Sequence, residues 1–463
     1  MTIAVGRRLA ILAVLAAAVL VISASAESKA RIVRLSEVQG TVQLDRSAGD
    51  GFDKAFINLP LIEGCKLKTG KDGRAEVEFE DGSALRLAPD SEVDFTRLAL
   101  GDDGQKLSTV QLVFGTVYAN LHPKKGDVKS ADQFLLNFAR ESVTVSEGAH
   151  FRVELADAMA TVSVFKGKVS ATAPAGKVEV AEKHSATIDL AKGKDAVAKD
   201  DQAKDEASSD AAKKETFALA KNIEQEPSDA WDHQQTDYHD RYATSDGSKG
   251  INSPYGYGMS DLNYYGSYMS LPGYGNVWQP YFTGASWSPF QDGAWAFYPG
   301  AGYMWVSGYP WGWMPSNYGN WVFVPGYGWV WQPGYFNTYS GIPRLVNAPV
   351  RTKVLTPPTS GHHTVMVGLG LTANPATGAP RRVTINPGSA GFGVPRGSVH
   401  HLDRVAKSME HNPQPITVAT APPVSTTAQT SGFGGSPLRG GSSGGMAPTG
   451  TPHRSPAPAS RPH

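Results

Sequence analysis

Cysteine is nearly absent from this sequence of 463 residues, since Cys65 is the only one. One cysteine cannot form a disulfide within the chain, so the folded state has to be held together by packing. Cys65 lies between Ile62 and Leu67, and we interpret it as a small buried hydrophobic residue rather than a reactive thiol. An excess of charge is missing as well. Lysine and arginine together number 43, as do aspartate and glutamate, so the net charge indicates no partner.

Catalytic signatures are also missing. The chain has no H-E-x-x-H, no G-x-S-x-G, no P-loop and no glycine-rich dinucleotide motif between a strand and a helix. The pairs His362-His363 and His400-His401 have no carboxylate or cysteine at ligand spacing, so we expect no metal site. We therefore expect no catalytic residue and no cofactor, and we do not expect an enzyme.

Long apolar runs are missing except for one at the N-terminus. Arg7-Arg8 precede the apolar stretch Leu9–Ile22, which is shorter than the about 20 residues of a membrane span. The small residues Ala24 and Ala26 then provide a signal peptidase site, so we predict a signal peptide over residues 1–26 and a mature start at Glu27. An uncleaved anchor is the alternative. We expect an exported protein, periplasmic, cell-surface or secreted, without a stable membrane span after cleavage.

Residues 31–190 carry the pattern of an antiparallel β domain. The turn dipeptides Asp72-Gly73 and Asp81-Gly82 enclose a run in which Ala75, Val77 and Phe79 point to one face. Three charged residues alternate with them, and we interpret these as the wet face of the strand rather than as an acid/base pair: Glu76, Glu78 and Glu80. Further strands are predicted over residues 83–88, 110–121, 134–138, 142–146, 150–155, 160–165 and 168–173.

The same region resembles the FecR domain. That family has a G-D-x-V-x-T-G opening, followed by R-A-E-L-x-F-x-D-G-S and L-R-L-x-x-x-S. Residues 61–70, 74–83 and 85–93 are similar to these three parts, and residues 38–42, 148–153 and 164–169 show a looser similarity. Cys65-Lys66 departs from the acidic residue and hydrophobe that the family often has. The resemblance implies an antiparallel β domain.

Residues 191–250 are rich in lysine, aspartate, glutamate and alanine, with both signs of charge interspersed. We predict a solvated, partly helical linker, with a helix over Ala211–Glu226 that places Phe217, Leu219 and Ile223 loosely on one side. No block of like charge is long enough to indicate nucleic acid binding.

An aromatic repeat follows in residues 251–340. Nine of the ten tryptophans lie between Trp278 and Trp331, and Pro272–Pro280 recurs as Pro325–Pro333 with one position changed. A middle copy at Trp295–Trp305 gives a unit of about 26 residues, too small to fold alone, so neighbouring units have to stack. The Pro-Gly turns and short aromatic runs predict one small β-rich module.

This module resembles a tryptophan-rich family of unknown function that commonly follows FecR domains. The similarity lies in Asp261–Gly266, Trp278-Gln279-Pro280, Trp287-Ser288-Pro289 and Pro310–Pro315, whereas Ser316-Asn317 and Asn320 depart from the family's pattern. The tryptophans have two interpretations. They form the core of a small module, which we prefer, or they stack on sugar rings. The candidates for stacking are the four in Trp-x-Pro triplets: Trp278, Trp287, Trp313 and Trp331.

Residues 341–463 form a tail in which glycine, proline, serine and threonine accumulate. Lysine and arginine outnumber the two acidic residues there, Asp403 and Glu410. We predict a low-complexity, basic and largely disordered tail that serves as a spacer. Attraction to anionic envelope polymers is the alternative.

The sequence as a whole predicts a mainly β, exported cell-envelope protein with a non-catalytic binding or scaffolding role. Its expected partner is a cell-wall glycan or an envelope protein, and not a nucleic acid. One alternative is carbohydrate binding, to peptidoglycan or exopolysaccharide, through the aromatic module. The other is an envelope signalling component related to FecR regulators, which join a periplasmic domain to a cytoplasmic segment that controls a sigma factor. Only residues 1–8 precede the apolar run, so we expect no sigma factor partner.

Overall fold

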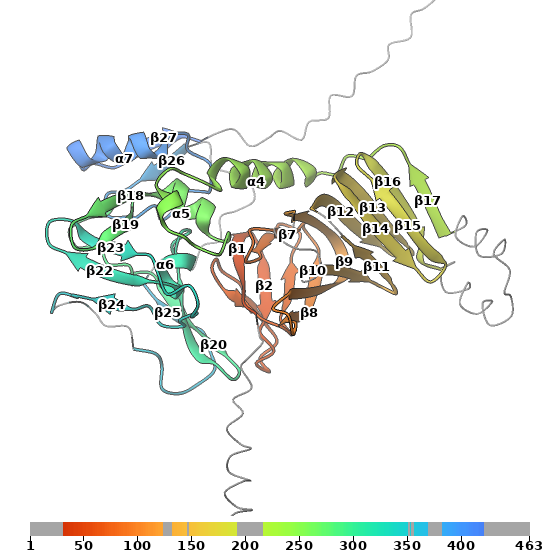
Figure 1. Ribbon diagram of the computed structural model, residues 1–463, viewed down its shortest axis with the longest axis horizontal. Coiled ribbons are helices and arrows are strands. Elements are labelled where there is room, and N and C mark those ends of the chain that lie inside the picture. Colours follow the sequence, from red (N-terminus) through yellow and green to blue (C-terminus); the bar gives the residue numbers. More distant parts are fainter. Residues whose placement is uncertain are drawn as a thin grey trace, which may run out of the picture. The chain divides into compact units, whose positions relative to one another are not determined.

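A computed structural model describes residues 31–123, 132–145, 148–191, 216–350, 352, 356–368 and 382–420, all within one compact unit (Figure 1). The predicted signal peptide with Ala24 and Ala26, part of the predicted linker, and the tail beyond residue 420 lie outside these ranges. Most elements are strands, which confirms the mainly β prediction. In the described ranges, no helix combines the length and the apolar character that crossing a membrane requires.

Residues 31–191 form the N-terminal β domain. Its strands are β1 (Val33–Gln39), β2 (Val42–Asp45), β3 (Phe52–Lys54), β4 (Pro60–Leu61), β5 (Lys66–Thr69), β6 (Arg74–Glu78), β7 (Ala84–Leu87), β8 (Glu92–Leu100), β9 (Lys106–Leu121), β10 (Gln133–Phe138), β11 (Glu141–Thr144), β12 (Ala149–Ala156), β13 (Met159–Lys166), β14 (Lys168–Ala173), β15 (Gly176–Ala181) and β16 (His184–Asp189). The strands predicted from alternation are found within a few residues of their expected places.

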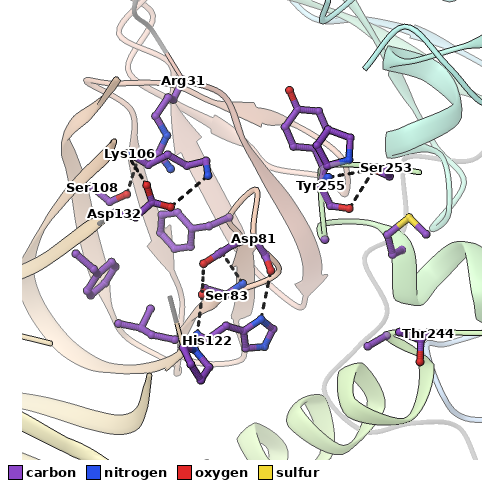
Figure 2. A pocket seen from close by; sticks show the side chains of 18 of the residues that line it. Arg31, Asp81, Ser83, Lys106, Ser108, His122, Asp132, Thr244, Ser253 and Tyr255 are labelled. Carbon is purple, nitrogen blue, oxygen red and sulfur yellow. Dashed lines mark hydrogen bonds and ion pairs between the residues drawn. The ribbon is translucent and has the colours of Figure 1, made fainter. Parts of the chain in front are cut away.

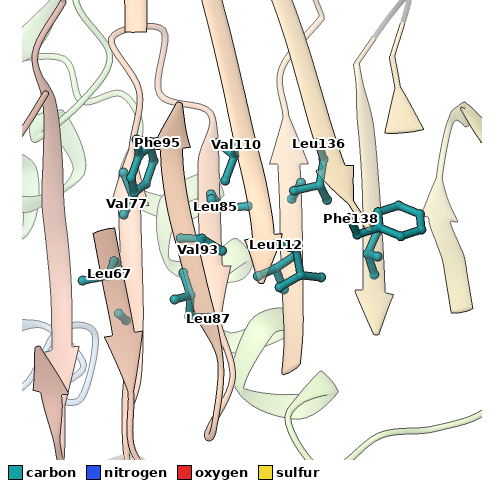
Figure 3. Close-up of a cluster of buried hydrophobic side chains, with 14 of the residues drawn as sticks. Leu67, Val77, Leu85, Leu87, Val93, Phe95, Val110, Leu112, Leu136 and Phe138 are labelled. Atoms are coloured by element: carbon teal, nitrogen blue, oxygen red, sulfur yellow. The ribbon is translucent and has the colours of Figure 1, made fainter. Parts of the chain in front are cut away.

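These strands form two half-sheets that share β9. One half runs β3-β2-β5-β8-β9-β10-β11-β14-β15, and the other runs β4-β1-β6-β7-β9-β12-β13-β16. Neighbours are antiparallel except β9 and β10, which are parallel. Side chains from both halves meet in one apolar core, shown in Figure 3 for Leu67, Val77 and Phe95 among others. Cys65 lies in this core, and its burial raises the pKa of the thiol to about 11.

Gly115 is the point at which β9 passes from one half-sheet to the other. Residues before it pair with β8 and β10, and residues after it pair with β7 and β12. Its φ is +88°, in the region that favours glycine, and a Cβ would lie 2.4 Å from the Asp90 carbonyl oxygen and from Ser91 Oγ. Only glycine therefore fits this bend.

Replacing Gly115 with alanine is expected to lower the free energy of unfolding by about 2–4 kcal/mol, because backbone strain adds to a steric clash. The matched control is Gly104→Ala, since Gly104 has a φ of +77° and no atom within 4 Å of the place that an added methyl group would occupy. This control has the backbone strain without the steric clash, so its free energy of unfolding should fall by only about 1–2 kcal/mol. Chemical denaturation measures both, and equal losses would contradict the role of the close contact.

The described part of the predicted linker is ordered structure. Strand β17 (Phe217–Ala220) extends the second half-sheet beside β16, with Phe217 buried and Leu219 exposed. The helix predicted over Ala211–Glu226 is therefore wrong from Phe217 to Ala220, where the chain forms a strand that pairs with β16. Helix α4 (Asp229–Tyr242) and the short 3₁₀ helix η2 (Ser248–Gly250) follow.

The three sequence repeats correspond to three β-hairpins. They are β18 (Gly266–Leu271) with β19 (Gly275–Pro280), β20 (Gly293–Tyr298) with β21 (Gly302–Ser307), and β22 (Asn320–Val324) with β23 (Gly328–Gln332). Each turn places proline second and a glycine of positive φ third, and a backbone bond of 3.0–3.1 Å closes it, as in type II turns. The shared Pro-Gly pair thus specifies one turn three times. Helices α5 (Met259–Tyr265) and α6 (Trp313–Asn317) and strands β24 (Leu345–Val346) and β25 (Val365–Val367) complete the aromatic module.

The first and third hairpins pair with each other, and the second does not join them. Gln279 Nε2 donates to the Tyr327 carbonyl and Gln332 Nε2 to the Tyr274 carbonyl, both at 2.8 Å, so each hairpin holds the turn of the other. The middle hairpin pairs with β25 and packs against the N-terminal β domain instead. There Tyr298 donates to the Pro60 carbonyl oxygen at 2.6 Å.

The first part of the predicted tail is also ordered. Strands β26 (Arg382–Ile385) and β27 (Ile416–Ala419) pair, and helix α7 (Leu402–His411) lies between them in the sequence. Leu402, Ala406 and Met409 recur at helical spacing and join the tryptophan core. Residues 382–420 are therefore part of the folded unit, because an amphipathic helix within the glycine- and proline-rich sequence docks on the aromatic module.

Candidate functional site

A buried face of charged residues lies on the second half-sheet, opposite the apolar core. The alternation of β6 that buries Ala75 and Val77 turns Glu76 and Glu78 to this face, where they are 0% and 1% exposed. The interpretation of Glu76, Glu78 and Glu80 as a wet face is therefore wrong. Helices α4 and α5 cover the face, and each glutamate is compensated by an arginine.

Arginines from neighbouring strands provide the first set of ion pairs. Arg34 on β1 bonds Glu78 at 2.9 Å and Asp261 on α5 at 2.6 Å. Arg86 on β7 bonds Glu76 at 2.7 Å and reaches Asp232 on α4 at 2.6 Å. The arginines thus bridge the half-sheet to both helices.

Helix α4 contributes a polar stripe to the same junction. Asp229 accepts hydrogen bonds from Arg152 and Tyr118, Asp232 lies 2.6 Å from His150 Nε2, and His239 Nε2 lies 2.9 Å from Glu76. The residues of the stripe follow Asp229 at three, six, seven and ten positions and so share one helical face: Asp229, Asp232, Gln235, Thr236 and His239.

Arg396, from the segment before α7, closes the network. Its guanidinium lies 2.6 Å from Glu76 and 3.1 Å from Asp261, and it donates to the Ser36 carbonyl oxygen at 2.9 Å. The side chain is 3% exposed and lies over the ring of Tyr238. A residue far along the chain therefore ties the N-terminal β domain to the aromatic module.

The electrostatics of this junction favour ionised carboxylates at its centre. Burial alone would raise the pKa of Glu76, but His239, Arg396 and Arg86 outweigh it and hold the pKa well below its ordinary value. Arginines and hydrogen bonds likewise lower the pKa of Asp232 and of Asp261 against the effect of burial. Glu37 differs, because burial raises its pKa more than Arg396 lowers it.

Ser260, His239 and Glu76 in the junction are arranged in the sequence of contacts of a serine–histidine–carboxylate catalytic triad. Ser260 Oγ lies 3.3 Å from His239 Nδ1, and the other ring nitrogen faces Glu76. Ser260 is 4% exposed, however, and Arg396 and Arg86 occupy the remaining positions around Glu76. A serine enclosed in this way has no approach for a substrate, so we assign the group to the ionic junction.

An open cleft of about 920 Å³ lies beside the junction (Figure 2). The N-terminal β domain lines one side, and the segment 243–259 lines the other. The two sides meet where Gly256 N donates to the Glu80 carbonyl oxygen at 2.7 Å. The cleft is therefore built from both parts of the chain, which this hydrogen bond joins at its edge.

Most of the polar groups on the β-domain side of the cleft are paired with one another. Lys106 bonds Asp132 through both its backbone nitrogen and Nζ, at 2.7 and 3.2 Å. In the turn before β7, Asp81 accepts from the backbone nitrogen and the hydroxyl of Ser83, each at 2.9 Å. Ser83 Oγ in turn accepts from His122 N at 2.9 Å. This side thus presents a fixed, hydrogen-bonded surface.

The opposite side and the floor add hydroxyl groups and rings. Figure 2 shows Thr244, Ser253 and Tyr255 across the cleft from the β-domain residues. Phe79 and Phe134 meet edge to face, with ring centres 5.8 Å apart, and also line the cleft. The site therefore combines buried and half-buried rings with neutral and paired polar groups.

The four tryptophans proposed for stacking lie in the core of the aromatic module. Trp278, Trp313 and Trp331 are 0% exposed and Trp287 is 5% exposed, so none of them has an open ring face. Trp278 Nε1 donates to the Leu262 carbonyl at 2.9 Å and Trp331 Nε1 to the Tyr318 carbonyl at 2.8 Å. None of the four lines the cleft.

The histidine pairs do not form a metal centre either. His362 stacks on Phe297 with ring centres 4.3 Å apart, and His401 precedes α7 with a φ of +55°. Across the described residues, no group of three histidine, cysteine or acidic side chains has an arrangement suited to a metal ion.

The fold and the junction define a two-module β protein, in which a bent antiparallel domain and a hairpin-repeat module share one ionic interface. A family model described as FecR protein matches residues 66–170, and one described as a family of unknown function (DUF6600) matches residues 259–355. The chain therefore contains a FecR domain followed by a DUF6600 domain, which confirms both resemblances.

Similarity to solved structures is weak. Two crystal structures of a protein from Parabacteroides distasonis ATCC 8503, provisionally assigned as an anti-sigma factor, are similar to 27% of this chain at 19% and 20% identity. The TM-score is 0.23 in both cases, and the chain spans 55% of that protein's length. A likeness of this size carries no argument about function. A comparison with curated protein sequences found no match.

Proposed function

We propose that this chain is an exported cell-envelope protein with a binding or scaffolding role and no catalytic activity, whose ligand occupies the cleft. The observation that supports a binding role is the construction of the cleft. Both domains line it, and the network around Glu76 and Arg396 joins them. A preformed concave site between firmly joined domains suits recognition of a ligand without large rearrangement.

The proposal of export rests on the sequence of residues 1–26, with its arginines, apolar run and small residues before Glu27. The proposal of a non-catalytic role rests on how the charged side chains are used. Glu76, His239 and Ser260 are enclosed in the junction, and Lys106 and Asp132 neutralise each other at the cleft. The expected partner is an envelope glycan or an envelope protein.

A sedimentation experiment tests this proposal. The chain purified from its producing cells should begin at Glu27 by N-terminal sequencing and should sediment with insoluble cell-wall material. It should release no soluble fragments from that material. A chain that keeps residue 1 and stays in the supernatant would overturn the proposal. So would turnover of the polymer that a point change abolishes.

Variants with single substitutions are the appropriate comparison with the natural chain in this experiment. A chain that lacks residues 255–336, most of the aromatic module, is not suitable. That deletion would remove Asp261 and Tyr298, which bond Arg34 and Pro60 in the N-terminal β domain. Buried charges and apolar surface would be exposed together, and any loss of sedimentation would then reflect unfolding.

A second candidate is an envelope signalling role, which the FecR family match favours. In that case the cleft would bind the signal, and a further protein would carry the response. Co-purification of the chain after crosslinking in cells separates the two candidates. A stable complex with a sigma factor would replace the scaffolding role, whereas recovery with envelope components alone supports it.

A further inference from the structure

The arginine and lysine side chains of the cleft have partners within the protein. Arg31 uses its guanidinium on Glu80, Ser108 Oγ and the Leu107 carbonyl. Lys106 is paired with Asp132, and Lys249 is paired with Asp246. A phosphate or another strongly acidic ligand would have to compete with these partners for each cation. The chemistry of the site therefore favours a ligand without net charge.

A peptide ligand is disfavoured by the strand pairing around the cleft. Recognition of an extended peptide commonly uses a free sheet edge. Strands β9 and β10 contribute to the cleft and pair with each other, and β9 also pairs with β8 where Lys106 and Ser108 line the cleft. Strand β10 pairs with β11 from Leu135 onward, so only Gln133 and Phe134 form an edge at the cleft, which is too short to hold an added strand.

Neutral hydrogen-bonding groups and rings remain for recognition. The side chains of Gln133, Asn252 and Thr244 are exposed at the cleft, where the two amides offer both donors and acceptors. Tyr255 and Phe134 are half-buried beside them, so each ring keeps an accessible part. Sugars present this same combination, with hydroxyl groups around the ring edge and apolar C–H groups on its faces.

The size of the cleft fits several sugar rings. Its volume of about 920 Å³ lies near the upper end of the about 300–1,000 Å³ typical of small-molecule sites. From the compensated charges, the paired strands, the neutral polar rim and the rings, we infer that this cleft binds an uncharged oligosaccharide. The inference rests on the proposed binding role. It assigns sugar recognition to cleft residues of both domains, and not to the four tryptophans that the sequence offered for stacking.

Calorimetric titration of the full mature chain tests this inference. The probes are cellotetraose and the tetramer of N-acetylglucosamine, with poly-glutamate as an acidic polymer. At least one tetrasaccharide should bind saturably and more tightly than poly-glutamate. The double variant Gln133→Ala, Asn252→Gly should weaken that binding by about tenfold or more, since two hydrogen bonds are lost. Glycine is used at position 252 because its φ is +53°, where alanine would add backbone strain.

The matched control is Tyr327→Ala, at an exposed hairpin turn away from the cleft, which should bind like the natural chain. Both cleft amides are exposed, so the double variant should keep the natural thermal unfolding midpoint. Tighter binding of poly-glutamate, no binding of either sugar, or equal binding by the double variant would overturn the inference.

The same proteins in the sedimentation experiment separate this inference from the proposed function. Sedimentation of the natural chain without any tetrasaccharide binding removes the oligosaccharide inference and leaves the envelope role. Tetrasaccharide binding at the cleft without sedimentation removes the envelope role and leaves the cleft assignment.

Discussion

Replacing Glu76 with glutamine is expected to lower the free energy of unfolding by about 3–5 kcal/mol, the usual cost of removing one partner from a buried ion pair. Glu76 is 0% exposed and meets Arg86, Arg396 and His239 at 2.6–2.9 Å. A neutral amide keeps the shape of the side chain but leaves two buried guanidinium groups short of a counter-charge. Denaturation in urea, followed by circular dichroism, measures the loss.

The matched control removes a charge from an exposed pair. Asp246 lies 2.7 Å from Lys249, with side chains 98% and 72% exposed. Asp246→Asn should leave the unfolding midpoint unchanged, because water solvates both groups in the folded and unfolded chain. If Glu76→Gln and Asp246→Asn had the same midpoint, the junction would not be what joins the two domains.

The low pKa of Glu76 also sets the direction of a pH effect. A carboxyl with a depressed folded-state pKa stabilises the protein fully above its ordinary pKa of 4.5, and this contribution is lost as the pH falls toward the folded-state value. Asp232 and Asp261, whose pKa values are also lowered, act in the same direction. Glu37, whose pKa is raised, acts in the opposite direction, because the stability that it contributes to the protein is lost as the pH rises.

Thermal unfolding between pH 3 and pH 7 measures this effect. The natural chain should lose stability as the pH falls below about 4.5, since three depressed carboxyls outweigh one raised carboxyl. Glu76→Gln should show a shallower decline, because it has already lost the largest of these contributions. Parallel declines in the two proteins would contradict the assignment to Glu76.

Local patterns in the sequence were sufficient to predict many of the strands and turns, although β8, β15 and β16 were not among them. Alternation at Ala75, Val77 and Phe79 predicted the inward face of β6 and its extension, because a strand inverts its side chains at every residue. The Pro-Gly repeats predicted tight turns between short strands. The structure makes these turns type II, which requires glycine at the third position. Both signals lie within a few residues, and no knowledge of the rest of the chain is needed to use them.

The covering of the outer face could not be predicted in this way. Alternation separates Glu76 and Glu78 from the core but does not say whether water or a helix lies on them. Helix α4 has few apolar residues, chiefly Trp231 and Tyr238, so a search for hydrophobic periodicity gives only a weak signal of a docking face. The spacing of Asp229, Asp232 and His239 was the available signal. It indicates a docking face only once the arginines of the half-sheet are known to lie opposite these residues.

The cleft was equally beyond local reasoning. Its residues come from the turn at Asp81–Ser83, from the start of β10 and from the segment 243–259. These segments meet because of the junction formed by Arg34, Asp261 and Arg396, whose partners are far apart in the sequence. A pattern of residue types along one strand or helix cannot predict contacts between segments that are so far apart in the sequence.

Replacing Trp331 with alanine is expected to lower the free energy of unfolding by about 3–5 kcal/mol through the cavity that it leaves. Trp331 lies in β23 opposite both Trp278 and Trp321, is 0% exposed, and donates from Nε1 to the Tyr318 carbonyl at 2.8 Å. The change removes an indole from between two hairpins and leaves that carbonyl without its indole donor. Guanidinium denaturation and near-ultraviolet circular dichroism measure the loss of stability and of packing.

Tyr327→Ala in the same repeat is the matched control for this prediction. Tyr327 is 53% exposed, and its bond to Gln279 uses the backbone carbonyl, which alanine keeps. The control should change the stability by less than about 0.5 kcal/mol. If Trp331→Ala folded with natural stability and lost saccharide binding, the tryptophans would be a binding surface. Loss of stability, with binding kept at temperatures where the variant is folded, assigns them to the core and leaves recognition to the cleft.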